Sequence, residues 1–131
     1  MTGRREACRR LRALIESAEW ARADRTLTRL RERFPRDAAL CGIEGIYWAR
    51  RGYWSPALRR FQCALVWDRD DANTVFNLGV TWCRLGAPVR GRLLMDYADG
   101  LTPAPFTWCL PAYGIAISQA PSPCGRGGHQ P

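Results

Sequence analysis

The sequence predicts an all-α fold, a stack of antiparallel helix hairpins, from two observations. Apolar residues recur three or four positions apart through most of residues 4–100, which is the period of helices that bury one face. The pattern also repeats, because the segment around Gly45 and Trp48 recurs 34 residues later around Gly79 and Trp82. A period of this length is typical of solenoids whose unit is a pair of helices.

The central unit, residues 38–71, predicts two helices separated by a turn. Gly52 lies between two runs of helical period and can adopt the left-handed conformation that follows a helix C-terminus. Ser55 and Pro56 then offer an N-cap hydroxyl and a proline suited to the first helical position. The two helices should therefore form a hairpin.

The same register extends to both sides of the central unit. The following unit has Gly86 at its turn, and its second helix carries Gly91 and Met95. The preceding unit has Ala18 where the other two have a turn glycine, and Ala23 at the crossing position. Together the units predict six helices, near residues 4–17, 20–33, 38–51, 54–67, 72–85 and 88–100.

The motif of the central unit is C-x2-E-G-x2-W from Cys41, followed by A-x3-F from Ala57. It resembles the tetratricopeptide repeat, whose 34-residue unit carries W-x2-L-G-x2-Y, then A-x3-F, then P. Cys41 replaces the tryptophan, Glu44 replaces the leucine, and Arg69 stands at the proline position. The resemblance implies a right-handed α-solenoid of about three repeats over residues 1–100.

Small residues fall where the two helices of each hairpin should cross, at Ala23, Gly45, Ala57 and Gly79. A side chain larger than a methyl group would hold the helices apart there. We assign these positions, and the large apolar residues around them, to core packing and not to a site.

Residues 101–131 form a second segment that is rich in proline and glycine and lacks the repeat. Six of the nine prolines lie there, and Pro111 would fall inside the first helix of a fourth unit, where proline costs about 3 kcal/mol. Residues 112–120 are the only candidate for a helix that caps the stack. Residues 121–131 are predicted to be disordered.

The charge of the chain is concentrated near its N-terminus. All twenty basic residues are arginine and the net charge is +8, and residues 1–37 hold eleven arginines against six acids. Such a face suits nucleic acid or an acidic protein. Only two aromatic residues that could stack on bases, Trp20 and Phe34, lie among these arginines, so the pattern disfavours nucleic acid. Genome bias toward arginine is the alternative explanation of the composition.

Catalytic, metal and membrane functions find little support in the sequence. The only histidine is His129, so a catalytic triad has no base, and no two of the six cysteines have the C-x2-C spacing of a metal or redox site. No apolar run is long enough to span a membrane, and the first twelve residues do not resemble a secretory signal. We expect a cytoplasmic protein with reduced thiols, no enzymatic activity, no cofactor and no metal.

The acids at 68, 70 and 71 are a further candidate site, but they lie between two expected helices. Asp70 or Asp71 can cap the helix that begins near Ala72. Capping explains this cluster better than calcium binding or acid–base chemistry does.

The resemblance also implies a site, since stacked repeats of this kind form a concave groove lined by the first helix of each pair. In this register Ile46, Phe76 and Val80 should form an apolar floor on which a partner segment lies. Arg12, Arg50 and Arg84 should flank this floor. The remaining groove positions are Cys8, Arg9, Gly42, Ile43, Asn73 and Asn77.

The groove chemistry indicates the kind of partner. Members that bind a C-terminal carboxylate use lysine, asparagine and arginine at fixed groove positions, where this chain has Cys8, Ile43 and Asn73, so that clamp is not expected. An apolar centre with arginine margins suits an extended segment with hydrophobic anchors and nearby acids.

Two functions follow as expectations. The first is a protein-interaction module or chaperone, similar in architecture to the small three-repeat chaperones and components of bacterial type III secretion. The alternative is a regulatory adaptor whose basic first repeat binds nucleic acid or an acidic protein. The sequence leaves open whether the chain is a monomer or a homodimer.

Overall fold

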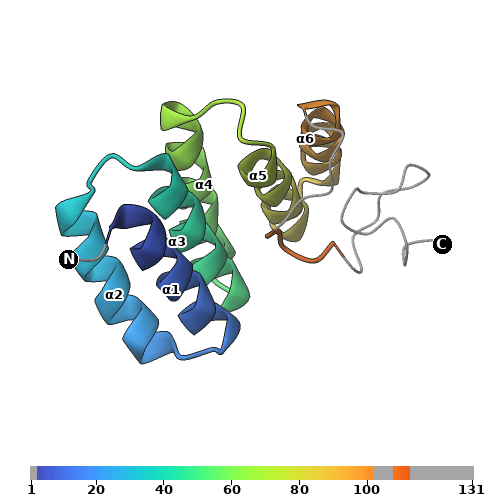
Figure 1. The fold of residues 1–131 in the computed structure, drawn as a ribbon. Coiled ribbons are helices and arrows are strands. Elements are labelled where there is room, and N and C mark those ends of the chain that lie inside the picture. Colours follow the sequence, from blue (N-terminus) through green and yellow to red (C-terminus); the bar gives the residue numbers. More distant parts are fainter. Residues whose placement is uncertain (1–2, 102–107, 113–131) are drawn as a thin grey trace.

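The computed structural model describes residues 3–101 and 108–112, and Figure 1 shows that the described part is helical, with the helices packed in adjacent pairs. It contains no strand in these two ranges. The helices are α1 (Arg4–Glu16), α2 (Trp20–Arg33), α3 (Ala38–Arg50), α4 (Trp54–Trp67), α5 (Ala72–Arg84) and α6 (Pro88–Leu101). The six-helix prediction is confirmed, and each end lies within one residue of its predicted place. Of the predicted cap at 112–120 the structure describes only Ala112, which is not helical, and the rest of it and the predicted disorder at 121–131 lie outside the described residues.

The three hairpin turns repeat one backbone device. Ala18, Gly52 and Gly86 all have positive φ, at 57°, 87° and 93°, and they are 34 residues apart. The backbone therefore needs a left-handed residue at this point of every hairpin, which glycine adopts at low cost. Ala18 adopts it with a side chain present.

The helix starts differ from the predicted caps in detail. The N-cap of α4 is Tyr53, not Ser55, and its side chain makes no capping hydrogen bond. Asp71 precedes α5 as predicted, but its carboxylate accepts from the Thr74 hydroxyl at 2.7 Å and caps no backbone N–H. A capping bond of the expected kind occurs at α3, where Asp37 accepts from the backbone N–H of Leu40 at 3.0 Å.

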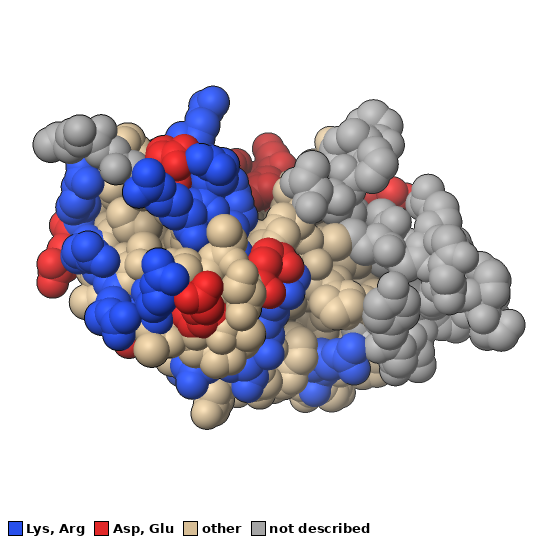
Figure 2. Space-filling model, turned by 60° about the horizontal axis from the view of Figure 1, so that its bottom comes forward, with Lys and Arg blue, Asp and Glu red and all other residues tan. Residues whose placement is uncertain are grey.

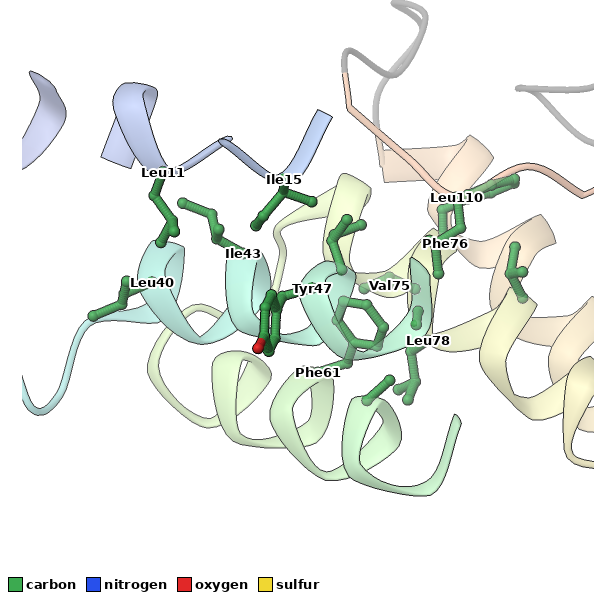
Figure 3. Close-up of a cluster of buried hydrophobic side chains, with 14 of the residues drawn as sticks. Leu11, Ile15, Leu40, Ile43, Tyr47, Phe61, Val75, Phe76, Leu78 and Leu110 are labelled. Atoms are coloured by element: carbon green, nitrogen blue, oxygen red, sulfur yellow. The ribbon is translucent and has the colours of Figure 1, made fainter. Parts of the chain in front are cut away.

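The core runs through the stack between the paired helices (Figure 3). Its largest fully buried side chains are Tyr47, Phe61 and Phe76. A methyl group on Gly45 would lie only 2.6 Å from Phe61 Cδ1, so the glycine allows α3 and α4 to approach each other. The assignment of the small residues to helix crossings agrees with this geometry.

Glu44 is a charged residue in an otherwise apolar position, with 3% of its surface exposed. Its carboxylate accepts from Arg31 Nη1 at 2.8 Å and from Trp48 Nε1 at 3.4 Å, and Arg60 Nη1 lies 3.9 Å away. Burying an unpaired carboxylate would cost several kcal/mol. Arg31 of α2 therefore joins the first hairpin to the second through this acid.

The cysteines differ in state along the chain. Cys8, Cys41, Cys63 and Cys83 are free thiols, as expected from their helical positions. The Sγ atoms of Cys41 and Cys63 lie 3.7 Å apart, and burial, followed by the hydrogen bond with Cys63, raises the pKa of Cys41 to about 12. Cys109 is disulfide-bonded, so the expectation of reduced thiols is wrong for this residue.

Candidate partner-binding groove

The first helices of the three hairpins, α1, α3 and α5, share one face, and a cleft of about 510 Å³ opens on it. This first cleft is lined by Arg12 and Ala13 of α1, Ala39 and Ile46 of α3, and Asn77 of α5. Trp108 closes one side of it, although this residue comes from beyond α6. The groove predicted from the repeat register thus has a counterpart in the structure.

A second cleft of about 510 Å³ lies at the other end of the same helices. It is lined by Ile15, Arg50, Trp54 and Arg84, together with Leu110 from beyond α6. Both clefts share Glu16 as a wall. We use the word groove for the two clefts together.

Residues 108–112 cross the groove between the two clefts, and we name them the docked segment. Figure 1 shows this non-helical segment in orange beside α5. The backbone N–H of Leu110 donates to Asn77 Oδ1 at 2.7 Å, and the Leu110 side chain is 1% exposed. In Figure 3 Leu110 lies beside Phe76. The chain therefore covers part of the groove with its own residues.

Trp108 anchors the other end of the docked segment to α1. Its indole N–H donates to the Glu16 carboxylate, and the Arg12 guanidinium lies over its ring at 5.9 Å. The same carboxylate accepts from Arg50 Nη2 at 3.0 Å. Glu16 thus holds the docked segment and α3 together.

The predicted apolar floor is buried more completely than an open groove would allow. Ile46 lines the first cleft with 1% of its surface exposed, and Phe76 and Val80 have none exposed. With the docked segment in place, a partner has no access to Phe76 or Val80. Their role as a floor stays a prediction for a groove from which the docked segment has left.

The predicted polar positions line the two clefts, and their role in binding a partner stays a prediction. Asn77 and Arg12 line the first cleft, and Arg50 and Arg84 line the second. The Arg84 guanidinium also lies 5.9 Å from the ring of Trp54. Of the remaining groove positions, Arg9, Gly42, Ile43 and Asn73 line the first cleft and Cys8 is buried in the core.

The docked segment and Glu16 were missed by reasoning from sequence. Trp108, Cys109 and Leu110 form a short apolar run in the proline-rich segment, which is the one signal that could have marked them. The run has no helical period, so nothing in it predicts which surface it covers.

A third cleft, of about 490 Å³, lies between α1 and α2. Arginines dominate its rim, and they are Arg10, Arg22, Arg29 and Arg33. Figure 2 shows basic side chains gathered toward this N-terminal end of the molecule. Some of the charge is neutralised locally, because hydrogen bonds from Arg9 and then Arg10 lower the pKa of Glu6.

The described part of the chain contains no cluster of side chains suited to bind a metal ion, since no three histidine, cysteine or acidic side chains come together there. His129, the only histidine, lies outside the described residues. Among the helices of the described ranges, none combines the length and apolar character that crossing a bilayer requires.

Comparison of the sequence with protein-family models and with curated proteins finds no match to either. The likeness to the tetratricopeptide repeat therefore depends on the motif and on the paired helices. Function has to be argued from the groove.

Proposed function

We propose that this chain is a non-enzymatic protein-interaction module of the tetratricopeptide repeat type, a right-handed stack of three helix hairpins that holds a partner segment in the groove. The observation that carries the proposal is that part of the groove is already occupied by a segment of the same chain, residues 108–112. The docked segment offers one backbone N–H to Asn77, one indole N–H to Glu16 and one buried leucine. A partner segment of similar chemistry would find the same groups.

The biological setting that we propose with this function is bacterial type III secretion. Small three-repeat proteins of this architecture serve type III secretion as chaperones that hold a hydrophobic partner segment. A chaperone must release its partner. The groove buries only one short apolar anchor, at the position of Leu110, between two open clefts. Because so little apolar surface is buried there, we expect reversible binding and not permanent assembly. Purification of the native protein, followed by identification of what stays bound, tests the setting.

Selection of peptides from a random display library on the full chain tests the groove itself. Ala39 is exposed and lines the first cleft, so Ala39→Trp should fill the cleft without disturbing the core. We expect it to weaken selected peptides at least about tenfold, or 1.4 kcal/mol. Ala21→Trp, at an exposed position of α2, is the matched control and should leave binding unchanged. Equal binding to both variants would place the peptides elsewhere.

A second candidate function is supported by the third cleft, whose four arginines suit an acidic segment of a partner protein. Exposed charges are screened over about 10 Å at 0.1 M salt, so binding of a polyglutamate peptide should weaken steeply with salt. Replacing Arg29 and Arg33 by glutamine should reduce the salt slope. The same change at Arg59 and Arg69, which are exposed on other elements, is the control, and duplex DNA bound as tightly as polyglutamate would indicate nucleic acid instead.

A further inference from the structure

The docked segment has a specific chemistry that can be read residue by residue. Asn77 is 3% exposed, and its Oδ1 accepts the Leu110 N–H at 2.7 Å. A buried acceptor that loses its donor and is not reached by water is strongly disfavoured. Whatever replaces the docked segment should therefore bring a hydrogen-bond donor to the same point, as the backbone N–H of Leu110 does, which an apolar side chain alone cannot do.

The side chains on either side of this hydrogen bond define two subsites. Leu110 is buried against Phe76, so its subsite accepts an aliphatic side chain. Two residues earlier, Trp108 is half-buried and is held by Glu16 through its indole N–H and by Arg12 over its ring. An aromatic residue with an N–H donor fits that subsite better than phenylalanine does, because only the former can donate a hydrogen bond to the Glu16 carboxylate.

The docked segment is also suited to exchange. It is short and non-helical, it is joined to α6 through residues 102–107, and two of its hydrogen bonds go to helix side chains, those of Asn77 and Glu16. The two clefts on either side of it give a competing segment room to approach. An attached segment that covers a site lowers the apparent affinity of a free ligand by the fraction of time the site is open.

We propose that the docked segment occupies the place of the partner, and that the partner is an unstructured protein segment with the pattern tryptophan, any residue, leucine. The partner binds by displacing residues 108–112 and takes over the bonds to Asn77 and Glu16. A residue without a backbone N–H, such as proline, is excluded at the leucine position. This inference rests on the proposed function and names its ligand.

The probe is a fluorescently labelled peptide with the sequence Trp-Ser-Leu-Pro-Ala, which copies residues 108–112 with serine in place of Cys109. Leu110→Asp in the full chain should release the docked segment, because a carboxylate is disfavoured at a buried site. We expect this variant to bind the peptide at least about tenfold more tightly than the original chain does, by fluorescence anisotropy. Val89→Asp, at a position of α6 that is 75% exposed, introduces the same charge outside the groove and should bind like the original chain.

A second peptide tests the backbone hydrogen bond directly. N-methylation of the leucine removes only the N–H that Asn77 accepts, so this peptide should bind the Leu110→Asp variant at least about tenfold more weakly than the unmodified one. Amide hydrogen exchange of the original chain gives an independent measurement. Leu110 should exchange slowly alone and faster at saturating peptide.

The outcomes separate the inference from the proposed function. Equal peptide affinity for the original chain and the Leu110→Asp variant would overturn displacement, as would unchanged binding after N-methylation. Library-selected peptides that bind the groove without the Trp-x-Leu pattern would overturn the inference and leave the proposed function standing. Failure of both kinds of peptide would overturn both. If Leu110→Asp does not fold, Trp108→Ala, which removes a half-buried anchor without adding charge, replaces it in the same assays.

Discussion

Gly91→Ala tests how closely α5 and α6 cross, and its expected effect runs against the repeat pattern. Tetratricopeptide repeats carry alanine at this position, so the substitution restores the common residue. In the structure, however, a methyl group on Gly91 would overlap the Gly79 carbonyl oxygen and the Cys83 sulfur, and would lie 3.0 Å from the Cys83 backbone nitrogen. A methyl group on Gly79 would lie 2.6 Å from the Gly91 oxygen. The two helices therefore touch backbone to backbone.

The magnitude follows from two opposed effects. Alanine in place of glycine within a helix gains about 1 kcal/mol of intrinsic stability. Overpacking costs about 1 to 3 kcal/mol, and the upper part of that range applies at Gly91 because two of the three atoms in the way belong to the backbone and cannot rotate aside. We expect the free energy of unfolding to fall by about 1 to 2 kcal/mol. For a domain of this size that lowers Tm by roughly 4 to 16 °C.

Thermal unfolding followed by circular dichroism measures the effect, and α6 supplies its own control. Gly100 lies in the last turn of α6 with nothing within 4 Å of an added methyl group. Gly100→Ala should leave Tm unchanged or raise it. A Gly91→Ala variant as stable as the original chain would refute the close crossing, because the gain in helix propensity would then meet no opposing contact.

Three further predictions concern the other hairpins. Gly45→Leu should lower the free energy of unfolding by about 3 kcal/mol, since its Cβ alone would lie 2.6 Å from Phe61 Cδ1; a denaturant midpoint like that of the original chain would contradict this. Ala18→Gly should raise that free energy by about 1 kcal/mol, because a left-handed φ of 57° is unfavourable for a residue with a Cβ, and a lower midpoint would count against it. Diamide should oxidise Cys41 and Cys63, whose sulfurs lie 3.7 Å apart, to an intramolecular disulfide while it takes up their two hydrogen atoms. Peptide mapping that finds both thiols free would show that α3 and α4 pack differently.

The helices and their turns could be predicted from sequence because the information that specifies them is local and occurs three times. A single 34-residue register fixed all three turns, at Ala18, Gly52 and Gly86, and so fixed the ends of the helices between them. It also placed Asn77 and the arginines on the helices that line the groove. A position whose role is ambiguous in one hairpin, such as Ala18, could therefore be assigned from the equivalent positions 34 residues away in the other hairpins.

The docked segment could not be predicted because its contacts are not local. Leu110 contacts Asn77, 33 positions away, and Trp108 contacts Glu16, 92 positions away. Neither contact produces a periodic pattern of residues that could be recognised in the sequence. The same contacts decide whether Phe76 is a groove floor or a core residue. An apolar residue on a first helix suits both roles, and only the covering segment separates them.

The departures from the repeat pattern make the neighbouring hairpins dependent on one another. At position 44 a buried glutamate stands where the motif that the sequence resembles has leucine, and Arg31 of the preceding hairpin, with Arg60 farther away, supplies the charge that allows its burial. Removing one partner of a buried pair leaves an uncompensated charge and typically costs about 3 to 5 kcal/mol. The Arg31 side chain is 48% exposed, so water can solvate its guanidinium when Glu44 is replaced. The Glu44 side chain is only 4% exposed, so water cannot solvate its carboxylate in the same way when Arg31 is replaced. The pair is therefore asymmetric: we expect loss of Arg31 to destabilise the stack more than replacement of Glu44 by an apolar residue does, with Arg60 of the second hairpin, 3.9 Å from Glu44, offsetting part of the cost.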